Sequence, residues 1–230
     1  MRADERLSLA AQLYEPCMVG ADIGTDHAYL PVTLLQKGIC RRMLLCDVSP
    51  SALAHARATV SRFHLEDRTR LMLCDGLSGL AETEEPCGCV SVTGMGGQTM
   101  ADILRRGQHS LRGAVLVLSA HTELNAVRQA VADIGYHLAR EQLCEAAGRM
   151  YIVWRAEPGQ ADMSPEAIRR GELLWQSPSP LTRRYAEKRL ALCLERQKGL
   201  LLRGGEPGEA EILAADIAFY RRRMAEGEEA

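Results

Sequence analysis

The chain has 230 residues, of which 47% are hydrophobic and 25% charged, and a formal net charge of −2. This composition suits a soluble α/β domain with a small appendage and excludes a chain too polar to form a core. No apolar run approaches the roughly 18 residues of a membrane span, and the charged segment 1–13 excludes a secretory signal, so we expect a cytoplasmic protein.

The eight cysteines are scattered along the chain, and Cys46, Cys74 and Cys89 fall inside strand-like segments. This pattern is typical of buried, reduced thiols in the cytoplasm. Cys87 and Cys89 have the wrong spacing for a zinc knuckle and lack a second pair. We therefore expect no metal.

The first two thirds of the chain alternate between short apolar runs and amphipathic segments. After a short helix at 4–14, buried strands are predicted at 19–23, 43–46, 71–74, 89–92 and 115–118. One helix is predicted at 29–36, with Gly38 as its stop. Another follows the N-cap Ser49 and Pro50, and a third runs from a Thr122 cap to Gly135.

Two further strands are predicted at 136–143 and 150–156, separated by only six residues. Six residues cannot hold a crossover helix, so these strands should form an antiparallel hairpin. Five strands alternating with helices and then a β-hairpin is the plan of Rossmann-like class I methyltransferases. We predict this α/β fold.

Beyond Pro158 the sequence becomes helical and charged, so we predict one domain at 1–158 and a helical appendage at 159–230. Heptad-spaced stripes lie on both sides of a Gly/Pro-rich turn at 204–208: Ala186, Leu190, Cys193, Gln197 and Leu200, then Leu213, Ile217, Tyr220 and Met224. They predict a coiled-coil-like helical hairpin.

The turn after the first strand, D-I-G-T-D-H-A-Y-L-P at 22–31, carries the most chemical information. A dinucleotide site would have G-x-G-x-x-G, whereas here only Gly24 stands in place. Asp26 lies where a phosphate would bind. A carboxylate there repels a pyrophosphate but suits a cationic ligand such as S-adenosylmethionine. The turn favours methyl transfer over hydride transfer.

Acidic residues also follow the next two strands. Asp47 can accept hydrogen bonds from ribose hydroxyls, and Asp75 from an adenine amine, while Gly76 lets the ring approach the backbone. Asp22 can orient the first loop or meet the ammonium group of the cofactor through water. Taken singly, each Asp could be only a helix cap or a turn residue.

Other candidate residues surround the same strand ends. Gly94, Met95, Gly96 and Gly97 follow the fourth strand, where they either hold the group to be methylated or form a tight turn. His27 and Tyr29, close to Asp26, are predicted site residues, and His121 is a weaker candidate. The remaining histidines, His55, His64, His109 and His137, are predicted to be surface or packing residues.

The segments 22–31, C-D-G-L at 74–77, T-G-M-G-G at 93–97 and G-R-M-Y-I at 148–152 resemble the bacterial tRNA (adenine-22-N1)-methyltransferases. The resemblance covers nearly the whole chain, including the helical appendage. It implies S-adenosylmethionine as cofactor and N1 of a tRNA adenine as target. It also implies a cofactor site of Gly24, Asp47, Asp75, Gly76 and Gly94, with Asp26, His27 and Tyr29 facing the base.

The appendage has a basic stretch, since residues 183–203 carry a local charge of +5. We expect Arg183, Arg184 and Lys188 to contact tRNA, the alternative being a solvated coiled-coil face.

Other functions stay open: methylation of another RNA base or a small molecule, or RNA binding without catalysis. A nicotinamide-dependent oxidoreductase is disfavoured by Asp26. The sequence leaves the oligomeric state open, with a monomer as the default expectation.

Overall fold

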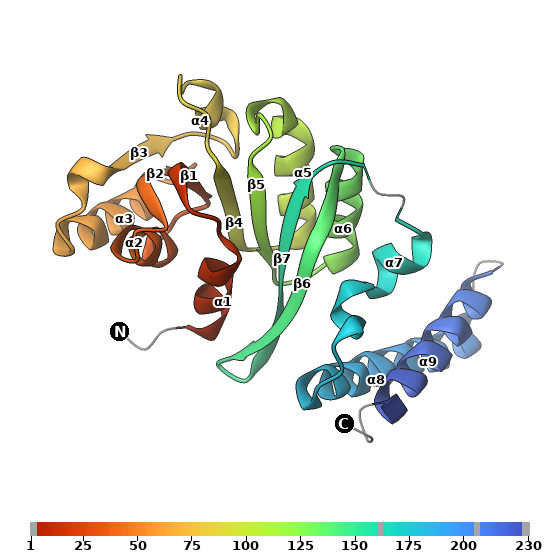
Figure 1. Cartoon of the computed structure of the whole chain (residues 1–230). Helices are drawn as coiled ribbons and strands as arrows, with labels where there is room; N and C mark the ends of the chain where they lie inside the picture. Colours follow the sequence, from red (N-terminus) through yellow and green to blue (C-terminus); the bar gives the residue numbers. More distant parts are fainter. Residues whose placement is uncertain (1–3, 161–162, 205–207, 227–230) are drawn as a thin grey trace. The chain divides into compact units, whose positions relative to one another are not determined.

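The computed structural model describes residues 4–160, 163–204 and 208–226, and within them seven strands form one sheet (Figure 1). The order in the sheet is β3-β2-β1-β4-β5-β7-β6. The strands are β1 Cys17–Ile23, β2 Cys40–Asp47, β3 Thr69–Leu73, β4 Cys89–Met95, β5 Val115–Ala120, β6 Tyr136–Ala146 and β7 Arg149–Pro158. Each overlaps a predicted strand, so the predicted Rossmann-like sheet is confirmed.

The first five strands are parallel, and β1 lies between β2 and β4. Burial explains this arrangement, because the last five residues of β1 are all buried, as expected for a central strand covered on both faces. Parallel strands bring their carboxyl ends to one edge of the sheet. The acids that follow β1 and β2 therefore meet at that edge.

The β6–β7 hairpin is confirmed and is tighter than predicted. Strand β6 runs three residues further than predicted and β7 starts one residue earlier, so that only Ala147 and Gly148 connect them. Both connecting residues have a positive φ, 49° and 73°, which matches the turn that best fits the twist of two hairpin strands. Strand β7 also pairs antiparallel with β5, so the hairpin completes the sheet.

Helices cover both faces of the sheet, with α1, α2 and α3 on one face and α5 and α6 on the other (Figure 1). Their bounds are α1 Glu5–Leu13, α2 Tyr29–Gln36, α3 Pro50–Arg62, α4 Ser78–Ala81, α5 Gly97–Gly107, α6 Leu124–Asp133 and α7 Pro165–Arg170. The predicted helices at 4–14 and 29–36 and the Ser49 cap are confirmed.

The predicted Thr122 cap of α6 is wrong. The N-cap is Glu123, which has φ +44° and makes no side-chain capping hydrogen bond. The Thr122 hydroxyl instead donates to the Glu123 carboxylate at 2.5 Å, and the Thr122 carbonyl accepts from the Gly97 amide. Because the Thr122 carbonyl is bound to α5 and its hydroxyl to Glu123, its side chain does not cap α6.

The chain divides into two compact units between Arg169 and Arg170, and the predicted domain boundary at 158 and 159 stays a prediction. In the second unit α8 Pro180–Arg203 packs along α9 Glu209–Glu226. Ser179 and Thr182 form a capping box at the start of α8. The described stripe residues with the least exposure are Ala186, Cys193, Leu200, Leu213, Ile217 and Tyr220, as the heptad spacing predicts.

No helix in the described ranges is both long enough and apolar enough to cross a lipid bilayer. All eight cysteines are free thiols, and six of them are buried.

Candidate active site

A cavity of about 250 Å³ lies at the carboxyl ends of β1, β2 and β4. Its lining includes four residues predicted to bind the cofactor, which the fold therefore brings together: Gly24, Asp47, Asp75 and Gly76. Met95, Ile103 and Arg106 line it as well. The cavity thus combines two carboxylates with an apolar wall.

The backbone conformation of the first loop favours glycine at position 24. Gly24 has φ +77°, and a Cβ atom there would lie 2.8 Å from Cε of Met95. The Gly24 amide donates to the carbonyl of Cys46 at 2.8 Å, which ties the loop to the end of β2. A side chain at this position would close part of the cavity.

Asp22 lies behind the cavity and is not among the described residues that line it. Its side chain is only 6% exposed at the end of β1. The Ser91 hydroxyl donates to its Oδ1 atom at 2.5 Å, and the Tyr14 hydroxyl donates to Ser91 at 2.9 Å. Burial raises the pKa of Asp22 to about 6, against the opposing effect of the Ser91 hydrogen bond.

Asp75 is bound by a residue of α5. Arg106 Nη1 lies 2.8 Å from Asp75 Oδ2, and Nη2 lies 3.3 Å from Oδ1. This contact raises the pKa of the Arg106 guanidinium. Asp75, Gly76, Ile103 and Arg106 also line a second cavity of about 320 Å³. The ion pair therefore stands where the two cavities adjoin.

Two thiols, those of Cys46 and Cys74, line the cavity of about 250 Å³. A hydrogen bond from the Cys46 thiol lowers the pKa of the Cys74 thiol below its usual value.

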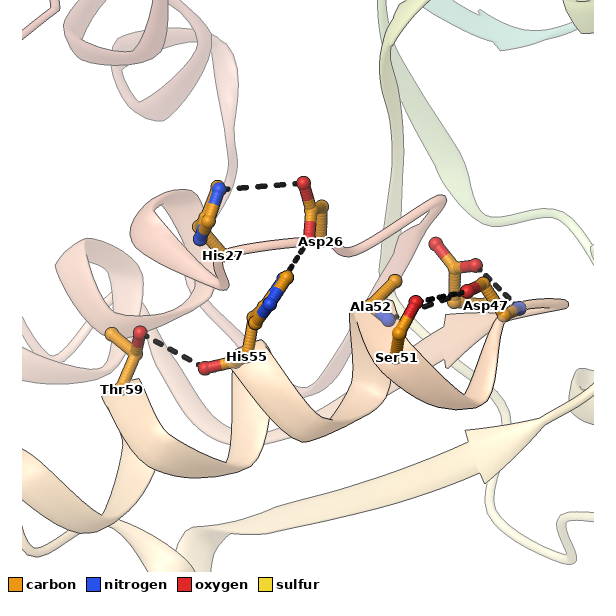
Figure 2. A network of polar contacts seen from close by, with 8 residues as sticks. Asp26, His27, Asp47, Ser51, Ala52, His55 and Thr59 are labelled. Carbon is orange, nitrogen blue, oxygen red and sulfur yellow. Dashed lines mark hydrogen bonds and ion pairs between the residues drawn. The ribbon is translucent and has the colours of Figure 1, made fainter.

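Asp26 and His27 lie on the loop that leads into α2, Tyr29 is the first residue of α2, and all three are partly exposed. Nε2 of His27 lies 3.3 Å from Oδ2 of Asp26. The His27 and Tyr29 rings stack with centroids 5.4 Å apart and an interplanar angle of 16°. Figure 2 shows a further contact that the sequence did not predict: Nδ1 of His55 lies 2.9 Å from Oδ1 of Asp26.

The segment after β4 approaches the start of α6 closely. A Cβ atom on Gly97 would lie 2.4 Å from the carbonyl oxygens of both Thr122 and Glu123. Gly94 has φ +84°, and Met95 reaches the cavity. The His121 amide donates to the Met95 carbonyl at 2.9 Å, which places His121 beside the predicted base-binding segment.

The three predicted tRNA-contacting residues lie on α8 in the second unit. Arg183 pairs with Glu187 at 3.4 Å, and the side chains of Arg184 and Lys188 are exposed on the surface of α8. Other basic residues of the stretch are paired within the unit, since Arg196 lies 2.6 Å from Glu209 and Lys198 2.7 Å from Glu195. The side chain of Arg203 lies outside the described part of the chain.

Sequence reasoning missed two residues, His55 and Arg106. His55 is on the surface, as predicted, but it also contacts Asp26. The contact could have been predicted from the position of α3, because this helix starts at the same edge of the sheet as the loop that holds Asp26. Arg106 gave none, because it is one of two adjacent arginines on an amphipathic helix. The ligand atoms of Asp26, His27 and His55 lie within 4.8 Å of one another, close enough for a metal ion, but the hydrogen bond between His55 and Asp26, the His27–Asp26 contact and the stacking of the two imidazoles already account for the cluster.

Comparison with known proteins identifies the first unit. Residues 3–154 match the family described as "Methyltransferase domain". The chain belongs to this methyltransferase family. A curated relative of this methyltransferase is the tRNA (adenine(22)-N(1))-methyltransferase of Bacillus subtilis (strain 168), 27% identical over 169 residues, which are 73% of this chain and 70% of the relative.

Solved structures share the fold of this methyltransferase over nearly its full length. Streptococcus pneumoniae Sp1610 in complex with S-adenosyl-L-methionine has 25% sequence identity and a TM-score of 0.84, covering 96% of this chain and 98% of that one. The B. subtilis M1A22 tRNA methyltransferase TrmK has 21% identity and a TM-score of 0.83, covering 97% and 99%, and supports the fold alone.

Proposed function

We propose that this methyltransferase transfers a methyl group from S-adenosylmethionine to N1 of adenine 22 in tRNA. The observation that carries the proposal is the cavity lined by Asp47 and Asp75, next to the half-exposed loop of Asp26, His27 and Tyr29. The B. subtilis relative, a tRNA (adenine(22)-N(1))-methyltransferase, supports the choice of target.

The cavity residues fit the cofactor chemically. Asp47 would accept from the ribose hydroxyls and Asp75 from the adenine amine, with Gly24 and Gly76 in the cavity wall allowing close approach to the backbone. Gly94 is not among the described lining residues, and it would meet the cofactor only beyond the cavity wall at Met95. Asp22, which does not line the cavity, would orient the first loop or contact the ammonium group of the cofactor through water. The acids favour a cationic ligand over a phosphorylated one. When bound, the cofactor supplies an electrophilic methyl group.

Adenine N1 carries an in-plane lone pair, so no residue has to remove a proton before transfer. The chain's task is then to hold and align the base, an effect that can supply roughly 7–11 kcal/mol of the barrier. Asp26 would stabilise the positive charge that develops on the base, and Tyr29 would stack on it. His27 would hydrogen-bond to the base, and Met95, Gly96, Gly97 and His121 would form the opposite wall.

A tRNA base must leave its stack to reach this loop, which requires a few kcal/mol from contacts elsewhere. We propose that Arg183, Arg184 and Lys188 on α8 supply part of this free energy by binding phosphates of the tRNA.

The free thiols and the proposed tRNA substrate support a cytoplasmic location. A monomer stays a prediction.

The proposal is tested by incubating the purified protein and methyl-labelled cofactor with bulk tRNA, then mapping the modified nucleotide. We expect N1-methyladenine at position 22. Label at a different base, or in metabolites but not in tRNA, would assign the enzyme to the alternative substrate class. A matched pair of variants tests the mechanism: Asp26→Ala should lose most activity, while His27→Ala loses less. A wholly inactive His27→Ala that binds cofactor normally would contradict alignment without a general base.

A further inference from the structure

Two imidazoles hold the carboxylate of Asp26, one on each oxygen. His55 Nδ1 lies 2.9 Å from Oδ1, and His27 Nε2 lies 3.3 Å from Oδ2 (Figure 2). The two histidines come from different elements, since His27 is in the same loop as Asp26 and His55 is on α3. Only the His55 contact therefore ties the carboxylate to a part of the fold outside its own loop.

The same histidine supports the ring beside Asp26. The His27 and His55 rings stack with centroids 5.2 Å apart and an interplanar angle of 14°, a favourable offset arrangement. Tyr29 stacks on His27 at 5.4 Å. His55 thus lies at one end of a series of three stacked rings, and Tyr29, the proposed base-stacking residue, lies at the other.

The position of His55 is fixed through the start of α3. The Ser49 amide donates to Oδ1 of Asp47 at 2.8 Å, and the Ser49 hydroxyl accepts from the Ala52 amide at 3.4 Å. One turn further on, the Thr59 hydroxyl donates to the carbonyl of His55 at 3.2 Å. The first turns of α3 therefore connect the proposed ribose-binding acid, Asp47, to the proposed base-facing acid, Asp26.

The loop of Asp26 needs such a support. It lies between Gly24 at φ +77° and Ala28 at φ +54°, and the Asp26 side chain is about half exposed. The side chain of an exposed aspartate on a loop can rotate, and such a rotation would move the carboxylate charge of Asp26 away from the proposed position of the target adenine. A hydrogen bond from a helix restricts that rotation before substrate binds.

We propose that His55 is a positioning residue for methyl transfer, holding the Asp26 carboxylate and the His27 ring in the orientation that receives the target adenine. This inference rests on the proposed function, because it assumes that Asp26 faces the base. His55 need not touch the substrate. Its effect should fall on turnover rather than on cofactor binding.

Steady-state kinetics with tRNA test the role. We expect His55→Ala to lower kcat about tenfold, as for loss of a hydrogen bond to a charged group, with the KM for cofactor unchanged. His55→Asn should restore kcat to within about twofold, because its amide nitrogen occupies nearly the place of Nδ1 and can donate to Oδ1. His109→Ala, at another exposed histidine, is the matched control. Full activity in His55→Ala, or no rescue by Asn, would overturn the proposal.

A double-mutant cycle separates an effect through Asp26 from an independent one. If His55 acts through Asp26, adding His55→Ala to Asp26→Ala should cause no further loss of kcat. An equal additional loss in that background would overturn the proposal while leaving the proposed function intact.

Imidazole ¹H–¹⁵N NMR tests the contact without any activity. We expect a proton on Nδ1 of His55 in the wild type and a shift of that signal in Asp26→Ala but not in His109→Ala. A His55 signal indifferent to Asp26 would refute the positioning role. Failure to methylate any tRNA adenine, with the NMR result as expected, would count against the proposed function instead.

Discussion

Arg106 and Asp75 form a two-point ion pair, 2.8 Å and 3.3 Å long, where the two cavities of the first unit adjoin. The pair neutralises a guanidinium that would otherwise face a cationic cofactor. Removal of Asp75 alone therefore has two effects, since it deletes a proposed adenine contact and leaves the positive charge of Arg106 without this partner.

This pairing predicts a compensating double variant. Asp75→Ala should weaken S-adenosylmethionine binding tenfold or more, roughly the effect of one charged hydrogen bond. Asp75→Ala combined with Arg106→Ala should bind more tightly than Asp75→Ala, because the uncompensated charge is gone. Calorimetric titration measures both, and equal affinities would show that the guanidinium does not influence the cofactor.

Asp22 should make stability depend on pH below neutrality. Its pKa is about 6 in the folded protein and about 3.9 when unfolded, so the folded state binds more protons between these values. The free energy of unfolding should thus fall as pH rises from 4 to 6. Relative to Asp22→Asn, the wild type should lose on the order of 2 kcal/mol over this range. Urea titrations followed by circular dichroism test it, with exposed Asp67→Asn as control.

Gly97 should tolerate no side chain. A Cβ atom would lie 2.4 Å from two backbone carbonyl oxygens, which cannot move without shifting the start of α6. Gly97→Ala should destabilise the first unit by about 2–4 kcal/mol. Gly199→Ala is the control, because nothing lies within 4 Å of its Cβ position, and replacing a helical glycine should add up to about 1 kcal/mol. Scanning calorimetry distinguishes the two.

Charge reversal on α8 tests the tRNA contact. Arg184→Glu with Lys188→Glu should weaken tRNA binding and flatten its dependence on salt, because phosphate contacts release counterions. Lys37→Glu, an exposed lysine at the end of α2, is the matched control. Binding measured between 50 and 200 mM salt, as is usual for such contacts, gives the slope. An unchanged slope would remove α8 from the proposed interface.

The strands were predictable because buried parallel strands are short apolar runs, and Met43–Cys46 within β2 is a clear case. The acids Asp47 and Asp75 were predictable for a related reason, since the carboxyl ends of such runs must meet at one sheet edge. The same argument predicted Gly24, which lines the cavity, and Asp26, which lies on the loop that follows it. Local sequence is therefore enough to predict which residues lie close together wherever the order of the strands determines their neighbours.

Contacts between helices and loops could not be predicted this way. His55 reaches Asp26 across 29 residues and Arg106 reaches Asp75 across 31, and neither distance follows from strand order. The capping error at Thr122 has the same origin, because a backbone contact to Gly97 decides the geometry there. Helix α5 begins in a glycine-rich segment that reads as a turn.

The place of β1 inside the sheet also affects how the protein is made on the ribosome. Its second neighbour, β4, is synthesised only at Cys89–Met95, and the cavity is not complete before Arg106. Until then the emerging chain carries an open strand edge that can pair with other chains. Ligand cannot stabilise these early intermediates, so their stability depends on the packing of α2 and α3 against β1, β2 and β3.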